Sequence, residues 1–225
     1  MLPEEYYSLQ TTMDSNIWEG VLGFMENHYR NYCETLVGVD RELGRLLQEL
    51  DDLGLSENTA IIYASDNGYS WGEHVITGKR WASEENMRIP FIVHYPGGVR
   101  GQDRRQSEMV LNIDYGPTIL DLAGLPIPEH IQGSSIRPLL MEEEVPWRDS
   151  FIYEYVKDFP YNVPAHQALR TDQYLYVTYD TGREPGLYDI KNDPRTLNDI
   201  RNTDEGRRVE PSLRQRMEEQ ETSLI

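Results

Sequence analysis

A series of leucines at helical spacing runs into a short all-apolar segment, and this succession restricts the folds open to the chain. Apolar residues recur every three or four positions in a predicted helix over about residues 18–53: Leu36, Val39, Leu43, Leu46, Leu47, Leu50 and Leu53. Gly54 follows directly, where helix ends favour glycine. Residues 59–64 (TAIIYA) are a continuous apolar run, which predicts a strand buried on both faces. A helix leading into such a strand indicates an α/β fold.

The segment between residues 89 and 124 continues this pattern. Residues 89–95 (IPFIVHY) predict a second strand, which a Pro-Gly-Gly sequence closes. Asp114 is predicted to cap a helix over residues 115–123, with Pro117 in its first turn and Gly124 at its end. The order helix, strand, loop, strand, helix is typical of α/β domains.

The chain changes character near residue 140, where an acidic segment begins. Four short strands are predicted after it, at residues 151–156, 166–171, 174–179 and 186–190. Polar residues from about 205 onward predict a surface helix. Sequential antiparallel strands after an α/β segment indicate a separate small subdomain. We therefore divide the chain into an α/β part, residues 1–140, and an antiparallel β subdomain, residues 141–225.

Residues 66–68 (Asp-Asn-Gly) end the first predicted strand and have two interpretations. Asn-Gly after a strand is a strong hairpin signal, which requires a second alternating strand directly after the turn. The residues that follow, 69–83, contain further glycines and charges without clean alternation, which weakens that interpretation. The alternative places two oxygen ligands at the carboxyl end of a buried strand, where open α/β sheets build their sites.

Composition excludes several classes of partner. A formal net charge of −18 argues against nucleic acid and anionic membrane surfaces. No apolar run approaches the ~18 residues of a membrane span, so we expect no membrane insertion. The single cysteine rules out an intrachain disulfide, and the first ten residues show no signal segment. Many of the 15 tyrosines cluster between residues 153 and 188, which predicts half-exposed strand faces.

Six segments occur in order between about residues 29 and 200. They are YRNYCETLVGVDRELGRLLQELDDLGL, NTAIIYASDNGYSWGEH, GKRWASEENMRIPFIVHYPGG, LNIDYGPTILDLAGLPIPEHIQGSSIRPLL, LRTDQYLYV and GLYDIKNDP. Together they resemble the C-terminal half of a type I sulfatase, of the alkaline-phosphatase-like superfamily. The resemblance implies part of a mixed sheet with flanking helices, followed by the small antiparallel subdomain. It assigns residues 1–140 to the C-terminal part of the sulfatase catalytic domain.

The resemblance also implies a metal ion and a sulfate-binding lysine. In these enzymes oxygen-bearing side chains hold a calcium ion, and Asp66 and Asn67 match the later pair of that set. A hard cation with carboxylate and amide ligands neutralises charge that develops on the sulfate. Lys79 matches the lysine that contacts the substrate sulfate. The spacing from Asp66 to Lys79 favours these roles over a structural turn and an ordinary solvated lysine.

Two histidines and an arginine are further candidates. His74 lies in the same glycine-rich loop, where it either touches the site or only orients the loop. His166 and Arg170 lie where the C-terminal subdomains of carbohydrate sulfatases reach over the pocket, which implies contact with substrate. The alternative for both is a solvent-facing strand position. An ion-paired turn leading into the second strand is predicted for Glu84, Glu85 and Arg88.

The chain departs from the sulfatase pattern most clearly at the nucleophile. Sulfatases convert a Cys or Ser in a C/S-x-P-x-R segment to formylglycine, but Cys33 lies in CETLVG and SSIRP has the wrong order. The early Asp–Asp metal pair and a middle His and Lys are also missing. Formylglycine and half of the calcium ligands are therefore expected in a missing N-terminal half. Leu175 and Thr196 replace the family's usual Lys and Glu, which puts C-terminal substrate contacts and one packing interaction in question.

The resemblance implies a sulfatase, a sulfuric ester hydrolase whose partner is a small-molecule or carbohydrate sulfate ester. Residues 154–177 resemble enzymes of sulfated sugars, including N-acetylglucosamine-6-sulfatase-like members, and tyrosine faces suit sugar rings. This chain alone is expected to be inactive, because it lacks the nucleophile. Two alternatives remain: a non-catalytic sulfatase-like binding protein, and a phosphate or phosphonate monoester hydrolase of the same superfamily. Full-length relatives are usually exported, and the sequence does not indicate a compartment.

Overall fold

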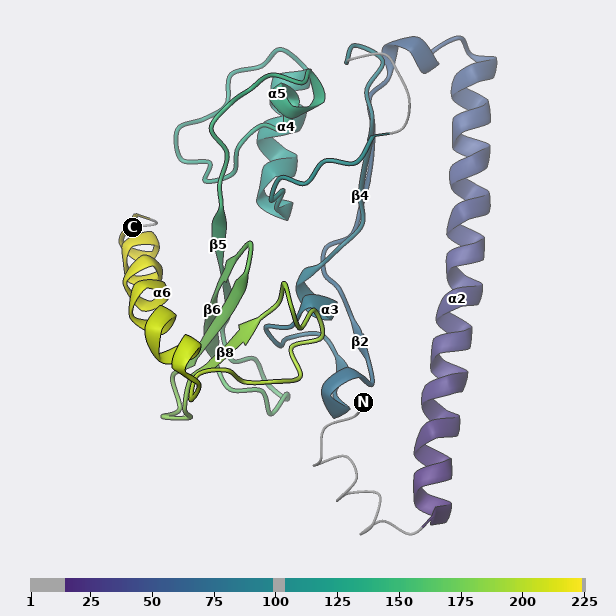
Figure 1. Cartoon of the computed structure of the whole chain (residues 1–225). Helices are drawn as coiled ribbons and strands as arrows, with labels where there is room; N and C mark the ends of the chain where they lie inside the picture. Colours follow the sequence, from purple (N-terminus) through teal and green to yellow (C-terminus); the bar gives the residue numbers. More distant parts are fainter. Residues whose placement is uncertain (1–14, 99–103, 224–225) are drawn as a thin grey trace. The chain divides into compact units, whose positions relative to one another are not determined.

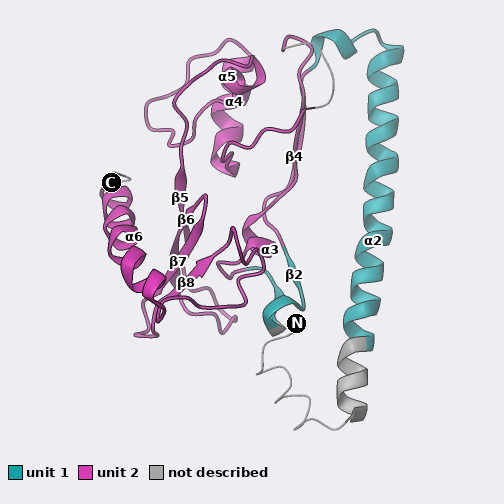
Figure 2. Ribbon diagram, in the orientation of Figure 1, with its two compact units in different colours: residues 1–59, 69–79 teal, residues 60–68, 80–225 magenta. Residues whose placement is uncertain are grey.

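The computed structural model describes residues 15–98 and 104–223 (Figure 1). Contacts within the chain divide it into two compact units (Figure 2). Unit 1 comprises Met1–Thr59 and Tyr69–Lys79, and unit 2 comprises Ala60–Gly68 and Arg80–Ile225. The domain boundary predicted near residue 140 divides the chain differently and remains a prediction. Within the described ranges, no helix is long and apolar enough to cross a membrane.

The long helix of unit 1, α2 (Ser15–Asp52), confirms the helix predicted from the leucine spacing. It ends in a Schellman motif, in which the amide of Leu55 donates to the carbonyl of Leu50 at 2.8 Å. Gly54 takes the left-handed position of this motif with φ +67°. The predicted helix end is therefore confirmed, together with its physical reason.

A hairpin that the sequence did not predict is the second part of unit 1. Its elements are β2 (Ser70–Trp71), the 3₁₀ helix η2 (Glu73–Val75) and β3 (Thr77–Gly78), and another 3₁₀ helix, η1 (Ser56–Asn58), follows α2. The ring of Trp71 lies 4.8 Å from that of Tyr32 and 5.4 Å from that of Tyr29, both of α2. Gly72 has φ +124°, which glycine adopts without strain. Two-residue strands are too short to produce a detectable alternation.

Unit 2 begins with two short antiparallel strands, β1 (Ile61–Ala64) and β4 (Phe91–His94), which confirm the two predicted strands. The helix α3 (Glu84–Met87) lies between them in the chain. Burial of β1 on both faces was predicted wrongly, since each of its residues is only half-buried, and Ile92 of β4 is 62% exposed. The reason is that β1 and β4 form a two-stranded sheet, with no third strand beside it in the described ranges.

Helix α4 (Tyr115–Leu122) confirms the helix predicted after Asp114. The short helices that flank it in the chain are η3 (Asn112–Asp114) and α5 (Arg137–Leu140). Asp114 stands at the N-cap position, but its side chain makes no capping hydrogen bond to α4. The carboxylate instead accepts the amides of Leu111 and Ser134, each at 2.8 Å, and pairs with Arg148. The predicted position of Asp114 is confirmed, but the predicted capping hydrogen bond is wrong, because these donors occupy the carboxylate.

Four antiparallel strands form the C-terminal sheet, and their spatial order follows the chain. They are β5 (Ser150–Tyr155), β6 (His166–Thr171), β7 (Tyr174–Tyr179) and β8 (Gly186–Asp189). The last helix, α6 (Asp204–Ser223), follows them. All four strands and this helix were predicted, so the C-terminal antiparallel sheet is confirmed, while its separation as a subdomain remains a prediction.

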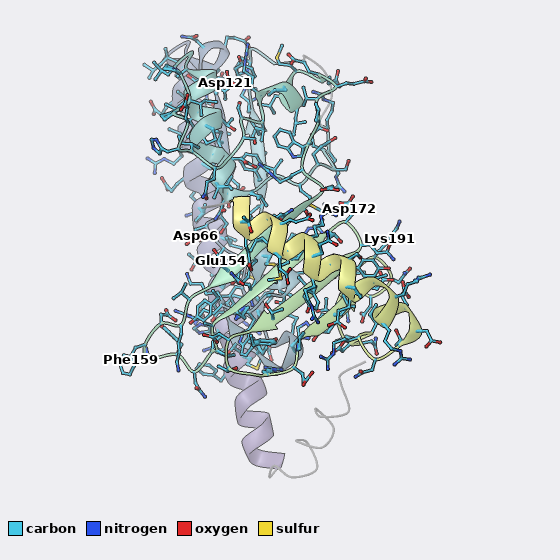
Figure 3. All side chains as sticks on the ribbon, turned by 90° about the vertical axis from the view of Figure 1, so that its left-hand side faces the viewer. Asp66, Asp121, Glu154, Phe159, Asp172 and Lys191 are labelled. Carbon is cyan, nitrogen blue, oxygen red and sulfur yellow. The ribbon has the colours of Figure 1, made fainter. Side chains whose placement is uncertain are left out.

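The C-terminal sheet packs on both of its faces. Figures 1 and 3 show α6 lying along one face. The core on that side consists of Leu169, Tyr176 and Leu187 from the strands and Leu213 and Met217 from α6. The opposite face buries Ala168, Leu175, Val177 and Ile190, against which Ala82 and Met87 pack. Leu175, at a position where the resemblance implied a lysine, is 0% exposed and is therefore a core residue.

Candidate functional site

The Asp-Asn-Gly segment after β1 is a compact loop rather than a hairpin turn. The amide of Asn67 donates to Asp66 Oδ1 at 2.9 Å, and its Nδ2 donates to the carbonyl of Gly68 at 2.8 Å. The amide of Gly68 donates to the carbonyl of Asn86 at 2.9 Å. A Cβ on Gly68 would lie 2.0 Å from the carbonyl oxygen of Glu85, so this close backbone approach requires glycine. The pairing of β1 with β4 excludes the hairpin interpretation.

The oxygens of this loop suit a hard cation. Asp66 is exposed and Asn67 is half-buried, and together they offer a carboxylate and an amide oxygen. No group of three or more His, Cys, Asp or Glu residues that could hold a metal occurs among the described residues. Asp114 is not a further candidate ligand, because Arg148 and two backbone amides occupy its carboxylate. The loop fits part of a calcium site, and the metal role of Asp66 and Asn67 remains a prediction.

Lys79 and His74 belong to the hairpin of unit 1. Lys79 directly follows β3 and is exposed. His74 is half-buried within η2 and has φ +55°, in the left-handed region that non-glycine residues seldom adopt, although histidine does so more often than most. The hairpin therefore carries both predicted catalytic side chains, while the predicted metal pair belongs to unit 2. Their combination in one site stays a prediction.

His166 is buried at the start of β6, which contradicts the alternative of a solvent-facing position. It is 3% exposed, and its Nδ1 lies 2.9 Å from the carbonyl oxygen of Pro164. Aromatic rings surround it, with centroid distances of 5.4 to 6.0 Å, from Tyr155, Tyr153, Tyr179 and Trp81. Burial lowers the pKa of His166, although the Pro164 carbonyl opposes this shift. The surroundings of His166 therefore disfavour the charged imidazolium.

The second ring nitrogen of His166 is left with a lone pair. A carbonyl oxygen only accepts, so Nδ1 carries the proton and Nε2 is the acceptor. Nε2 is buried and has no hydrogen-bond partner among the residues that the structure describes. An unsatisfied acceptor in an aromatic environment is unfavourable for folding alone.

Arg170 also differs from a solvent-facing strand residue. Its Nε lies 2.9 Å from Oε1 of Glu84, and the side chains of this pair are 20% and 17% exposed. The pair joins β6 to α3, so Glu84 is ion-paired with a distant strand, and an ion pair within the turn of Glu84, Glu85 and Arg88 remains a prediction. Because its guanidinium is already neutralised, Arg170 has less charge to offer a sulfate. Its contact with substrate remains a prediction.

Arg80, which follows Lys79 directly, is a residue that the sequence reasoning missed. Its guanidinium carbon lies 3.3 Å from the centroid of the Tyr161 ring, and its Nε lies 3.3 Å from Oδ1 of Asp158. These partners belong to the connection between β5 and β6. A charged residue in a segment without periodicity gives no signal of such contacts before the fold is known.

Comparison with known proteins decides the family. Residues 2–125 match the family model described as sulfatase, and residues 72–223 match the model described as N-sulphoglucosamine sulphohydrolase, C-terminal. The chain belongs to the sulfatase family. The resemblance drawn from the six sequence segments is thereby confirmed.

Individual members of the family are similar to this chain in sequence and in structure. An N-acetylglucosamine-6-O-sulfatase of Bacteroides thetaiotaomicron is 36% identical over 200 residues, which cover 86% of this chain and 36% of that protein. A solved structure in complex with its substrate D-glucosamine-2-N,6-O-disulfate has a TM-score of 0.81 and 30% identity. That match covers 98% of this chain and 45% of the other. The α/β sulfatase-like fold is thus shown.

A third similar protein is named for a different reaction, the hydrolysis of phosphonate monoesters. The phosphonate monoester hydrolase of Agrobacterium radiobacter has a TM-score of 0.75 and 26% identity, with 83% of this chain and 40% of that chain covered. Across these three comparisons, the chain spans 36 to 45% of the length of the relatives that it matches.

Proposed function

We propose that the chain is part of a sulfatase that hydrolyses the sulfate ester of a sulfated carbohydrate of the N-acetylglucosamine-6-sulfate type. The observation that carries the proposal is the 36% identity to an N-acetylglucosamine-6-O-sulfatase over 86% of this chain. The similarity to a structure bound to a disulfated glucosamine supports the same substrate class.

Lys79 is the residue that we assign to the ester sulfate. It is exposed at the end of the hairpin of unit 1, so its ammonium is accessible to a substrate. An ammonium placed at the sulfate stabilises the negative charge that grows as the S–O bond breaks. His74, in η2 of the same hairpin, either orients the hairpin or contacts the substrate directly.

Asp66 and Asn67 would hold part of the ligand shell of a calcium ion. When bound, the ion acts as a Lewis acid on the sulfate. The two residues supply only a small part of the ~6–8 oxygens that calcium takes, so the affinity of this chain alone for calcium is expected to be weak.

His166 and Arg170 are assigned to the carbohydrate side of the site. The Nε2 of His166 is an acceptor without a partner among the described residues, and because it is buried, a sugar hydroxyl reaches it only if the surrounding aromatic rings move. Arg170 is held by Glu84, so it is the less strongly supported of the two.

Complementation tests this proposal. The chain is purified alone and also co-expressed with an N-terminal sulfatase half that carries formylglycine, and both are assayed on N-acetylglucosamine-6-sulfate. We expect no turnover by the chain alone, since it lacks the nucleophile, and turnover by the complemented pair. Lys79→Ala should abolish that turnover, whereas Lys191→Ala, at another exposed lysine, should retain it.

Three results would contradict parts of this proposal. Turnover by the chain alone that disappears in Lys79→Ala would show that a nucleophile is present after all. Turnover by the pair that does not depend on Lys79 would remove its assignment to the sulfate. Binding of the sulfated sugar without any turnover by the pair would favour the non-catalytic binding protein.

A phosphonate or phosphate monoester hydrolase is the second candidate, and the fold match to a phosphonate monoester hydrolase favours it. Assays of the same complemented pair distinguish a sulfatase from a phosphonate or phosphate monoester hydrolase. The ratio of kcat/KM on an aryl sulfate to that on a phenyl phosphonate monoester should exceed one for a sulfatase. A ratio below one would favour the second candidate.

A further inference from the structure

The connection between β5 and β6, residues 156–165, has an exposed apolar tip; we call it the β5–β6 loop. Phe159 is 98% exposed and Val156 is 82% exposed. Figure 3 shows Phe159 on the part of this loop that projects away from the sheet. An exposed phenylalanine forgoes one of the larger gains that burial of a side chain can provide.

Both sides of this tip are attached to one arginine. Arg80 makes an ion pair with Asp158, which precedes Phe159, and stacks at 3.3 Å on the ring of Tyr161, which follows shortly after. The hydroxyl of Tyr155, at the end of β5, also donates to Asp158. The loop is therefore held at both ends of the tip, while the Phe159 ring itself remains exposed.

The strained backbone conformation of Arg80 supports a functional role for its contacts with the β5–β6 loop. Its φ is +117°, whereas the other three described non-glycine residues with positive φ have values of 48 to 57°, within the left-handed helical region. Such strained conformations persist only where the surrounding contacts fix them, and they concentrate at functional sites. In the sequence, Arg80 directly follows Lys79, the proposed sulfate-binding lysine.

The chemistry of the tip suits a charged sugar. A pyranose ring presents an apolar face of C–H groups, which matches the flat face of an exposed aromatic ring. Lys157 lies two residues before Phe159 and is exposed, so it offers a positive charge to a sulfate group. The three lysines of this acidic chain are Lys79, Lys157 and Lys191.

We propose that the β5–β6 loop is a carbohydrate-recognition element, in which the ring of Phe159 stacks on a pyranose ring of the sulfated substrate. Arg80 is a positioning residue in this arrangement, because it holds the loop through Asp158 and Tyr161. The assignment rests on the proposed function and deepens it, since it names a side chain that determines the preference for a sugar sulfate over other sulfate esters.

The test compares two ligands and two exposed phenylalanines. The 225-residue chain is titrated with N-acetylglucosamine-6-sulfate and, separately, with inorganic sulfate, and binding is followed by NMR. Phe159→Ala should weaken the affinity for the sugar sulfate roughly 3- to 10-fold and leave that for inorganic sulfate unchanged. Phe159→Trp, which retains a stacking face, should bind like the unmodified chain. Phe24→Ala is the matched control, because Phe24 is 68% exposed and lies in α2.

Release of the loop gives an independent readout. Tyr161→Leu removes the ring on which Arg80 stacks, so it should weaken binding of the sugar sulfate while Phe159 is intact. Saturation transfer from the protein to the ring protons of the sugar should be lost in Phe159→Ala and retained in Phe159→Trp.

Each outcome has a defined meaning. Equal affinity of Phe159→Ala and the unmodified chain for the sugar sulfate overturns the assignment, as does the absence of any measurable sugar binding. A parallel loss of inorganic sulfate binding also overturns it, and a change only in sedimentation would assign the ring to a protein contact. If Lys79→Ala changes neither affinity while Phe159→Ala weakens sugar binding, the proposed function fails and the loop assignment stands.

Discussion

At the scale of single residues, Asp114 shows how the chain accommodates a buried charge. Its side chain is 0% exposed, yet each carboxylate oxygen has partners. Arg148 donates to both oxygens, and the backbone amides of Leu111 and Ser134 complete the set. These partners lie just before η3, α5 and β5, so the carboxylate joins three segments. Removing one partner of such a pair leaves the other charge buried and unpaired, which is strongly destabilising.

We therefore expect Asp114→Ala to lower the free energy of unfolding by about 3–5 kcal/mol. Urea denaturation followed by circular dichroism measures this change. Asp204→Asn is the control, since Asp204 is 102% exposed and pairs with Arg207 on the surface of α6. Its effect should stay within about 0.5 kcal/mol. Similar small losses in both variants would show that the Asp114 cluster contributes no more than a surface pair.

His166 predicts a dependence of stability on pH. Burial lowers its pKa below the ordinary value of 6.5; the carbonyl of Pro164 and the charge of Asp180 oppose this shift, and Arg183 reinforces it. In the unfolded chain the imidazole takes up a proton near pH 6.5, while the folded chain resists protonation until lower pH. Its contribution to stability is therefore present above pH 6.5 and is lost as the pH falls towards the folded pKa.

The measurement is the melting temperature at pH 7.5 and 5.5. His166→Phe keeps an aromatic ring among the tyrosines and removes the titrating group. The melting temperature of this variant should therefore fall less from pH 7.5 to pH 5.5 than that of the unmodified chain. His130→Phe, at an exposed position, should keep the original decrease. An unchanged decrease in His166→Phe would show that other groups cause the pH dependence.

At the scale of elements, the C-terminal sheet and α6 form the most buried part of unit 2. Leu169, Tyr176 and Leu187 are each at most 1% exposed, and Leu213 and Met217 of α6 cover them. We expect Leu187→Ala to lower the free energy of unfolding by about 2–5 kcal/mol, because it leaves a cavity between the sheet and the helix. Urea denaturation measures this loss. Leu125→Ala, at a residue that is 55% exposed, should change stability by less than about 0.5 kcal/mol, and equal effects would contradict this packing.

The elements also show which features could be predicted from sequence. Strands β6 and β7 and the end of α2 were predicted because short strand-like runs joined by a turn and a C′ glycine are local signals. The chemistry of Asp114 could not be, since its partner Arg148 lies 34 residues away. Likewise, the burial of His166 depends on Trp81, which is distant in the sequence and whose ring centroid lies 6.0 Å from that of His166. For the proposed site, local motifs suggested Asp66, Asn67 and Lys79, whereas contacts between distant segments identified Arg80.

At the scale of the whole molecule, apolar surface remains uncovered in both units. The large apolar side chains of α2 are 40 to 68% exposed at Phe24, Leu36, Val37, Val39, Leu46 and Leu47. In unit 2, β1 and β4 form a two-stranded sheet whose outer edges carry no further strand in the described ranges. Apolar surface is worth ~25 cal/mol per Å² when buried, so a few hundred exposed Å² represent several kcal/mol. Uncovered apolar faces and open strand edges promote aggregation.

We therefore predict that the chain alone is prone to aggregation and becomes more soluble when co-expressed with a sulfatase N-terminal half. The physical reason is that the chain spans 36% of a relative with which it shares 36% identity, and the remainder of such a protein is available to cover α2 and the β1–β4 sheet. Sedimentation velocity of the chain with and without the added half measures this difference. The double variant Val37→Glu and Leu46→Glu should raise the soluble fraction of the chain alone and lower its recovery with the added half. Leu125→Glu, at an exposed apolar residue outside α2, should change neither. A monodisperse monomer with one cooperative unfolding transition would instead mean that the 225 residues fold as a self-sufficient unit.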